Sequence, residues 1–358
     1  MKIVSIIGAR PQFIKCAPLS RVMRKENEEI LVHTGQHYDS EMSDVFFKEL
    51  NIPEPDYNLN IGSGSHGDQT GRMLTEIEQV ILNEEPEFVL VYGDTNSTIA
   101  GALAASKLNI KIAHVEAGLR SFDRRMPEEI NRVLTDHISD LLFCPTESAI
   151  TNLNKEGIFH GVHHVGDVMN DALENNKKIA EKASTVLEEL SLTPTEYMVA
   201  TIHRPSNTDS IENMTSIVKA FSDVDKKIVF PVHPRTEKYL KKYGLWDQLN
   251  EKVKVIAPLG YLDMVKLMSN SAHILTDSGG VQKEAYMLGV PCTTLRDNTE
   301  WIETVEDGWN VLVGANYSRI VNAVNRNNFS ILKKRNVFGC GNASETICQI
   351  LRYEENTG

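Results

Sequence analysis

Short apolar segments rich in valine and isoleucine recur along the chain, and stretches with helical periodicity separate them. A segment that is apolar on both faces is typical of a parallel strand buried between two layers of helices. This alternation predicts an α/β fold with parallel sheets and right-handed crossovers. Strand patterns occur at residues 2–8, 29–35, 87–94, 111–118, 140–146 and 162–166, and again at 197–203, 227–233, 253–258, 273–278 and 290–296. The helical patterns include residues 69–82 and 261–270.

The two series of strands are separated by residues 167–191, a polar stretch that is expected to form one long helix. We therefore predict a domain boundary near Gly166. The expected fold is α/β, with two doubly wound parallel-sheet domains, residues 1–166 and 167–342, that face each other across a central cleft. The C-terminal segment 343–358 has helical spacing and is expected to pack back on the first domain.

The composition excludes several classes of partner. A net charge of −12 argues against binding to nucleic acid or to an anionic membrane surface. The five cysteines are scattered without a CxxC pair, so neither a zinc site nor a disulfide framework is expected. No segment approaches the roughly 20 apolar residues of a membrane span. We expect a cytoplasmic protein with no metal, no nucleic-acid partner and no membrane partner.

Four carboxylates lie where predicted elements begin or end. Asp94 and Glu116 follow consecutive parallel strands, so their side chains can converge at one edge of the sheet. Glu128 and Glu129 follow Pro127 at an expected helix start, where a carboxylate also simply stabilises the helix. Clustered carboxylates raise one another's pKa, so one can hold a proton while another is ionised. Such a group can act as acid and base at neutral pH.

A Mg²⁺ site is the competing interpretation of these carboxylates. Nearby arginines already supply positive charge, which favours the acid–base interpretation, and we expect them to neutralise the carboxylates or to contact a substrate. Asp123 and Glu129 are expected to be ordinary solvated residues. The arginines are Arg120, Arg124, Arg125 and Arg132.

The segment GARPQFIK, residues 8–15, connects the first predicted strand to a helix. Proteins that bind a dinucleotide carry GxGxxG at this place, whereas only Gly8 is present here, so a nicotinamide cofactor is not expected. Arg10 and Lys15 instead suit a phosphate or carboxylate group near the helix N-terminus. An ordinary turn with one surface arginine is the alternative.

A second strand-to-helix connection is TDSGGVQKEA, residues 276–285. Gly279 and Gly280 allow the backbone to approach a ligand closely, and the helix N-terminus that begins after Ser278 can bind phosphate. Glu284 lies one to two turns further on, where it could accept hydrogen bonds from ribose hydroxyls. A tight turn with a serine cap is the alternative interpretation.

His203 and Arg204 in ATIHRPSN, residues 200–207, end a strand expected to neighbour this turn. The pair is suited to contact a diphosphate or to assist proton transfer, although a histidine at a strand end is often structural.

Taken together, the motifs resemble those of the non-hydrolysing UDP-N-acetylglucosamine 2-epimerases. The resemblance spans nearly the whole chain, and its motifs occur in family order. They are GARPQFIK, VYGDTNST, HVEAGLRSF, MPEEINR, IHRPSN, PVHPR, TDSGGVQKEA, TLRDNTE and NVLVGA.

The resemblance implies a fold of the glycosyltransferase-B type with two Rossmann-like domains and no cofactor. It implies reversible inversion of UDP-GlcNAc to UDP-ManNAc at C2, by anti elimination of UDP to 2-acetamidoglucal and re-addition, as a step toward surface polysaccharide synthesis. The implied acid–base residues are Asp94, Glu116, Glu128 and His203. The implied UDP-binding residues are Arg10, Lys15, Arg204, Ser278, Gly279, Gly280 and Glu284.

Family members are commonly homodimers, so a homodimer is expected. Gln36, His37 and Arg72 match parts of a regulatory site at which bacterial members bind a second UDP-GlcNAc, whereas Asp39 stands where glutamine is frequent.

The segment Glu300-Trp301-Ile302-Glu303 departs from ERPE, which is frequent in relatives, and resembles the branch acting on UDP-2,3-diacetamido-glucuronate. That sugar is therefore an alternative substrate. A hydrolysing epimerase, a retaining glycosyltransferase and a non-catalytic UDP-sugar sensor are further alternatives.

Overall fold

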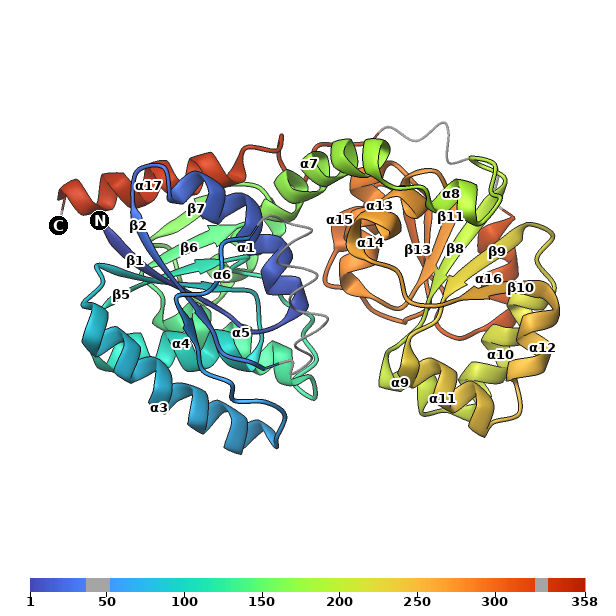
Figure 1. The fold of residues 1–358 in the computed structure, drawn as a ribbon, viewed down its shortest axis with the longest axis horizontal. Coiled ribbons are helices and arrows are strands. Elements are labelled where there is room, and N and C mark those ends of the chain that lie inside the picture. Colours follow the sequence, from blue (N-terminus) through green and yellow to red (C-terminus); the bar gives the residue numbers. More distant parts are fainter. Residues whose placement is uncertain (37–51, 326–333, 358) are drawn as a thin grey trace. The chain divides into compact units, whose positions relative to one another are not determined.

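The computed structural model describes residues 1–36, 52–325 and 334–357 (Figure 1). They form two compact units, which confirms the predicted pair of parallel-sheet α/β domains. The first unit comprises Met1–Glu174 together with Asn336–Gly358, and the second comprises Asn175–Arg335. The chain thus passes into the second unit within helix α7 (Val168–Ala183), on the C-terminal side of Gly166, and the returning segment begins at Asn336.

The first unit contains a seven-stranded sheet in which every neighbouring pair is parallel. The order β3-β2-β1-β4-β5-β6-β7 reverses beside β1, as in a doubly wound Rossmann-like fold. The strands are β1 (Lys2–Ile7), β2 (Glu28–His33), β3 (Tyr57–Asn58), β4 (Phe88–Tyr92), β5 (Lys111–Val115), β6 (Leu141–Cys144) and β7 (Val162–His164).

The second unit repeats this arrangement with a six-stranded parallel sheet in the order β10-β9-β8-β11-β12-β13. The strands are β8 (Tyr197–Thr201), β9 (Lys227–Pro231), β10 (Val253–Ile256), β11 (His273–Thr276), β12 (Cys292–Thr294) and β13 (Asn310–Leu312).

Helices cover both faces of each sheet (Figure 1). In the first unit α3 packs against α4 and α4 against α5, while the C-terminal helix α17 lies against α1. The helices of this unit are α1 (Arg10–Met23), α3 (His66–Glu84), α4 (Asn96–Lys107), α5 (Pro127–Ile138), α6 (Glu147–Lys155) and α17 (Ala343–Thr357), with α7 spanning the boundary. Those of the second unit are α8 (Val186–Glu189), α9 (Pro205–Thr208), α10 (Ile211–Ser222), α11 (Pro234–Lys242), α12 (Trp246–Lys252), α13 (Tyr261–Ser269), α14 (Gly279–Leu288), α15 (Ile302–Glu306) and α16 (Tyr317–Val324).

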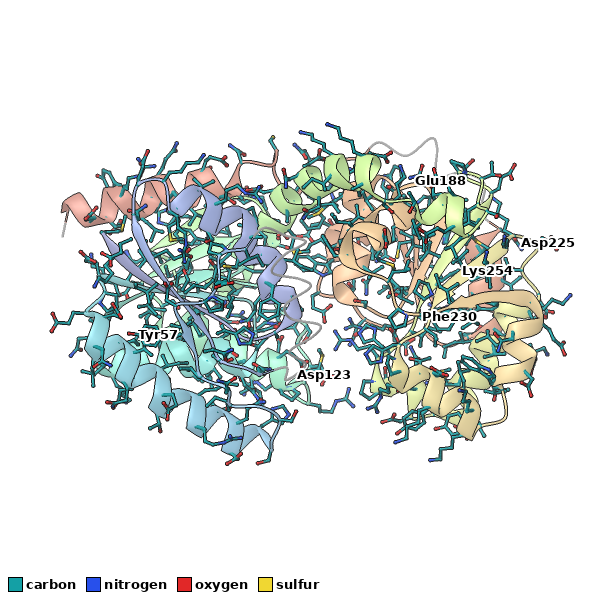
Figure 2. All side chains as sticks on the ribbon, viewed as in Figure 1. Tyr57, Asp123, Glu188, Asp225, Phe230 and Lys254 are labelled. Carbon is teal, nitrogen blue, oxygen red and sulfur yellow. The ribbon has the colours of Figure 1, made fainter. Side chains whose placement is uncertain are left out.

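Two short strands, β3 (Tyr57–Asn58) and β13 (Asn310–Leu312), were not predicted. In β3, the Tyr57 hydroxyl donates a hydrogen bond of 2.5 Å to Glu84 at the end of α3 (Figure 2). The single helix expected over residues 167–191 was wrong, because α7 ends at Ala183 and α8 begins at Val186. The Ser184 hydroxyl between them donates to Asp263 at 2.6 Å, so this short link is held by a side-chain contact.

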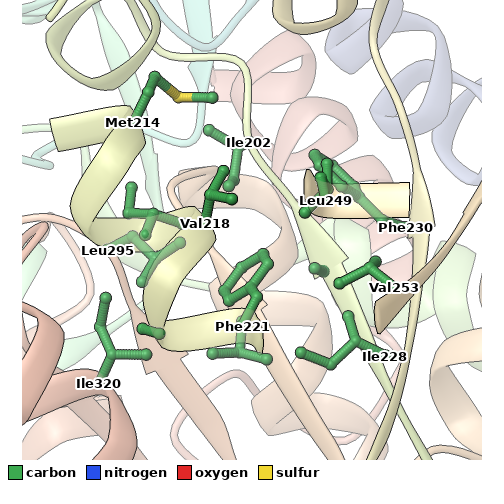
Figure 3. Close-up of a cluster of buried hydrophobic side chains, with 14 of the residues drawn as sticks. Ile202, Met214, Val218, Phe221, Ile228, Phe230, Leu249, Val253, Leu295 and Ile320 are labelled. Carbon is green, nitrogen blue, oxygen red and sulfur yellow. The ribbon is translucent and has the colours of Figure 1, made fainter. Parts of the chain in front are cut away.

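Buried residues on both faces of a strand explain the absence of an alternating polar pattern. Met198 and Ala200 of β8 belong to one hydrophobic cluster, whereas Tyr197 and Val199 belong to another. Figure 3 shows the first cluster, in which the ring of Phe221 meets that of Phe230 edge to face at 6.4 Å. Each sheet is therefore packed on both faces, and the predicted functional residues follow the ends of its strands.

Among the described helices, none combines the length and the apolar content that crossing a bilayer requires.

Phe221→Ala is expected to destabilise the second unit by about 3–5 kcal/mol, because it removes a fully packed ring and leaves a cavity. Phe221 is 2% exposed. Urea unfolding monitored by tryptophan fluorescence and circular dichroism measures the change. Phe159→Ala is the control, since that ring is 65% exposed and its loss should change the free energy by no more than about 0.5 kcal/mol. Equal losses in both variants would contradict this account of the core.

Candidate active site

The first unit brings Asp94 and Glu116 to one edge of its sheet. Both residues follow adjacent parallel strands, β4 and β5, and the Gly93 N–H donates to the Val115 carbonyl at 3.0 Å. Glu116 has a φ of +73°, a left-handed conformation that costs about 1–3 kcal/mol for a residue with a β-carbon. Its N–H is held by the Phe143 carbonyl at 3.1 Å. The turn therefore keeps a strained carboxylate in a fixed place, as functional sites often do.

Glu116 forms a buried ion pair with Lys15 of α1. Their side chains are 8% and 9% exposed, so the ammonium group compensates a carboxylate that water reaches poorly. Gly93 makes this approach possible, because a β-carbon there would lie 3.1 Å from Lys15 Nζ and 3.3 Å from Glu116 Oε2. Lys15, predicted as a phosphate ligand, thus contacts the proposed acid–base residue in this structure.

Asp94 is paired with a different cation. Arg132 of α5 contacts the Asp94 carboxylate and, at 3.0 Å, that of Glu129. The Asn131 amide also donates to the Asp94 carbonyl at 3.0 Å. The Asp94 side chain remains 31% exposed, so its carboxylate is accessible while its position is fixed.

Of the two neighbouring glutamates on α5, Glu129 is the buried one. It is 3% exposed and accepts hydrogen bonds from the Ser121 N–H and the Phe122 N–H at 2.9 and 2.8 Å. The prediction that Glu129 is a solvated residue was wrong, because its carboxylate organises the preceding loop. Glu128 is only partly buried.

The neighbouring arginines have distinct partners. Arg125 pairs with Asp123 at the surface (Figure 2), and its hydrogen bonds lower the pKa of Asp123 to about 2. Arg120 is buried between Asp136 and Glu156, at 2.6 and 2.7 Å. These arginines were expected to neutralise the predicted acid–base carboxylates. Among the described contacts, Arg132 does so, because it pairs with Asp94.

In the second unit, Asp277 organises the segment that carries His203 and Arg204. Asp277 is fully buried and accepts the N–H groups of both residues at 3.0 Å, together with the Asn207 amide at 3.0 Å. Its Oδ1 also lies 3.6 Å from His203 Nδ1. Because Asp277 directly precedes Ser278, one carboxylate joins the two predicted phosphate-binding turns of this unit.

The glycine turn after β11 has the predicted form, with Ser278 as the N-cap residue of α14. A β-carbon at Gly279 would lie 3.4 Å from Glu300 Oε2 and 3.7 Å from Trp301 Nε1. No Ser278 side-chain cap bond is present, so the serine-cap alternative lacks its contact.

Trp301 is 5% exposed and lies over Lys283, whose Nζ is 4.2 Å from the ring centroid. Glu284, the predicted ribose ligand, is 6% exposed and accepts a hydrogen bond of 3.1 Å from the Tyr261 hydroxyl. Trp301, which stands in place of the arginine of ERPE, therefore packs beside the glycine turn and contacts the buried ammonium group of Lys283.

The predicted regulatory residues are only partly described. Gln36 accepts the Ser97 N–H and hydroxyl at 3.0 and 2.7 Å. Arg72 donates to the Ile61 carbonyl at 2.7 Å and pairs with Asp68 at 2.9 Å. His37 lies outside the described residues.

The side chain of Arg10 is likewise not described. Within the described part of the chain, no group of three or more His, Cys, Asp and Glu side chains is arranged to hold a metal ion.

Comparison with known proteins gives concordant results. The family model described as UDP-N-acetylglucosamine 2-epimerase matches residues 21–352. A UDP-N-acetylglucosamine 2-epimerase homolog of Methanococcus maripaludis is 60% identical over 98% of this chain and 99% of its own. The UDP-2,3-diacetamido-2,3-dideoxy-D-glucuronate 2-epimerase of Pseudomonas aeruginosa is 50% identical over 98% of this chain and 99% of its own.

Among solved structures, the UDP-GlcNAc 2-epimerase of Methanocaldococcus jannaschii, in complex with UDP-GlcNAc and UDP, superposes with a TM-score of 0.90. It is 51% identical, with 99% of this chain and 100% of that chain covered. These matches make the protein an isomerase with two Rossmann-like domains, as its motifs predict. The chain belongs to the UDP-N-acetylglucosamine 2-epimerase family.

Glu129→Ala is expected to lower the free energy of unfolding of the first unit by about 3 kcal/mol, because it breaks a buried ion pair and leaves two N–H groups without an acceptor. Chemical denaturation measures this loss. Glu128→Ala, one position away on the same helix turn, is the control and should cost less than about 1 kcal/mol. A larger loss of stability from Glu128→Ala than from Glu129→Ala would contradict the conclusion that Glu129 is the structural glutamate.

Proposed function

We propose that the protein is a non-hydrolysing epimerase that interconverts UDP-N-acetylglucosamine and UDP-N-acetylmannosamine by inversion at C2. The observation that carries the proposal is the pair Asp94 and Glu116 at adjacent strand ends, each held by its own cation, in a member of this family. The presence of UDP-GlcNAc and UDP in the complex of the Methanocaldococcus jannaschii relative supports a UDP-sugar as ligand.

The chemistry explains why carboxylates are needed. The C2 proton of the sugar is not next to a carbonyl, so direct removal faces a prohibitive barrier. Loss of UDP from C1 gives the ring oxocarbenium character and weakens the C2–H bond. A base takes the C2 proton, the released electron pair forms the C1–C2 double bond, and UDP leaves with the electrons of the C1–O bond. UDP then adds back to C1 while an acid delivers a proton to the opposite face of C2.

This route requires at least two groups in different protonation states. Asp94, Glu116, Glu128 and His203 are proposed to supply them. Asp94 and Glu116 suit this division of labour because their environments differ: one side chain is 31% exposed beside Arg132, and the other is 8% exposed beside Lys15. Either can also stabilise positive charge on the ring.

The leaving diphosphate must be stabilised and retained. We propose that the backbone of the glycine turn at the start of α14 and the His203–Arg204 segment bind it, because Asp277 holds these two turns together. Glu284 is proposed to accept the ribose hydroxyls. Arg10 and Lys15 complete the proposed set of UDP ligands.

UDP-2,3-diacetamido-glucuronate is the second candidate substrate. Trp301 favours it, since the tryptophan stands where many relatives carry an arginine and is packed over Lys283. The Pseudomonas aeruginosa relative named for that sugar is about as similar as the Methanocaldococcus jannaschii enzyme named for UDP-GlcNAc, at 50% and 51% identity.

The proposal extends to the setting of the enzyme. We propose a cytoplasmic homodimer whose product enters surface polysaccharide synthesis. Gln36, His37 and Arg72 are proposed to form part of a regulatory site for UDP-GlcNAc.

Incubation of the protein in D₂O with UDP-GlcNAc, and separately with the diacetamido-glucuronate, tests reaction and substrate together. NMR should show deuterium at C2 and the UDP-linked epimer for the true substrate. Free sugar instead of the UDP-linked epimer would indicate hydrolysis. Turnover that depends on an acceptor would indicate a glycosyltransferase, and binding without exchange would indicate a sensor.

Glu116→Gln and Asp94→Asn are each expected to lower epimerisation by at least about 10³-fold, because each removes a proton-transfer group. UDP affinity, measured by calorimetry, should stay within about twofold. Asp123→Asn is the matched control, since that carboxylate pairs with Arg125 at the surface and its loss should leave the rate unchanged. Full epimerase activity in either active-site variant would contradict the proposed proton-transfer role of the replaced carboxylate.

A further inference from the structure

His114 and Asp136 form a buried pair in the first unit, apart from the residues assigned above. His114 lies on β5 and Asp136 on α5, and they are 0% and 1% exposed. Asp136 Oδ1 lies 2.7 Å from His114 Nδ1. A buried ionisable pair of this kind needs partners for its remaining polar atoms, and those partners lie next to the proposed acid–base residues.

Each member of the pair holds one glycine. His114 Nε2 lies 2.7 Å from the Gly93 carbonyl, and Asp136 Oδ2 accepts the Gly118 N–H at 3.1 Å. Arg120 donates to the same Asp136 oxygen at 2.6 Å. An unbroken series of hydrogen bonds therefore runs from the Gly93 carbonyl through His114 and Asp136 to the Gly118 N–H.

These two glycines belong to the turns that carry the proposed acid–base residues. Gly93 directly precedes Asp94, and Gly118 follows Glu116 by two residues. Both glycines have positive φ, +64° and +79°, and Glu116 itself is at +73°. The two glycines adopt this conformation without steric cost, whereas Glu116 is strained and needs surrounding contacts to hold its turn in one arrangement.

The direction of the hydrogen bonds is fixed by their acceptors. The Gly93 carbonyl can only accept, so His114 Nε2 carries a proton. Burial alone would raise the pKa of Asp136, but hydrogen bonds and charges from His114 and Arg120 lower it. Asp136 Oδ2 accepts hydrogen bonds from the Gly118 N–H and from Arg120, and Asp136 Oδ1 lies against His114 Nδ1.

We propose that His114 and Asp136 are positioning residues for the transfer of the C2 proton, because they hold the Asp94 and Glu116 turns in a fixed relation. This inference rests on the proposed function. It assigns the pair no contact with the substrate. Misplacement of catalytic groups by about 1 Å can cost a factor of about 10² in rate, so the role is measurable.

Asp136→Ala and Asp136→Asn separate positioning from charge. Asparagine can keep every hydrogen bond if its oxygen accepts from Gly118 and Arg120 while its amide donates to a neutral His114 protonated at Nε2. Alanine breaks the series. The alanine variant should lower kcat for deuterium exchange at C2 by about 10²-fold, with UDP affinity within about twofold, whereas the asparagine variant should stay within about fivefold of the wild type.

Glu29→Ala is the matched control. Glu29 is a buried carboxylate of the same unit, 5% exposed, that accepts from Ser5 at 2.7 Å and Arg24 at 2.8 Å near the amino end of β2. It should lose stability as Asp136→Ala does, measured by thermal unfolding, yet keep kcat at a temperature well below its melting point.

Wild-type kcat in Asp136→Ala, or an equal loss of kcat in Glu29→Ala, would overturn the positioning role. Asp136→Asn as slow as Asp136→Ala would also overturn it, since charge rather than geometry would then matter. If Asp136→Ala does not fold, His114→Gln replaces it, because glutamine can reach only one of the two partners and should also slow exchange. Absence of exchange by the wild type with either UDP-sugar would overturn the proposed function itself.

Discussion

Parallel pairing between β4 and β5 is the interaction on which the candidate site of the first unit depends. Tyr92 lies opposite Val115 in this pair, so Gly93 and Glu116 are the next residues on either side, and the Gly93 N–H continues the ladder. The pairing places the two turns that carry Asp94 and Glu116 at the same end of the sheet. Cations from two different helices, Lys15 of α1 and Arg132 of α5, compensate the two carboxylates. The sheet thus positions the turns, and the helices supply the opposite charges.

In both units a buried carboxylate satisfies backbone groups at the ends of neighbouring strands. A strand that ends in a turn leaves backbone groups without sheet partners, and they must be satisfied before side chains can be held still. In the second unit the Asp277 carboxylate collects N–H groups from the neighbouring strand end. In the first unit Asp136 holds one turn directly and the other through His114. In each unit a buried carboxylate links two neighbouring turns through hydrogen bonds.

The parallel-sheet architecture can be predicted from the sequence because buried strands appear as continuous apolar runs. The ends of these runs locate Asp94, Glu116, His203 and the glycine turn. Contacts that depend on tertiary packing cannot be predicted in this way. Glu128 and Glu129 look alike beside Pro127, and only the path of the preceding loop makes Glu129 the buried residue. His114 lies 22 positions from Asp136, so nothing local reveals their contact. Asp277 precedes the glycine turn, yet its partners lie on another strand end.

The insertion of the second unit within the sequence of the first has a consequence for synthesis. Residues that pack α17 against the rest of its unit, among them Ile347 and Leu351, are fully buried but are synthesised after the whole of the second unit. Where the chain departs and returns, the Gly166 and Gly339 backbones are so close that a β-carbon on either would lie 3.1–3.2 Å from the other. All residues of the second unit are therefore synthesised before those of the first unit are complete. During synthesis, the unit that contains the glycine turn therefore has its complete sequence available before the unit that contains the strained Glu116 turn.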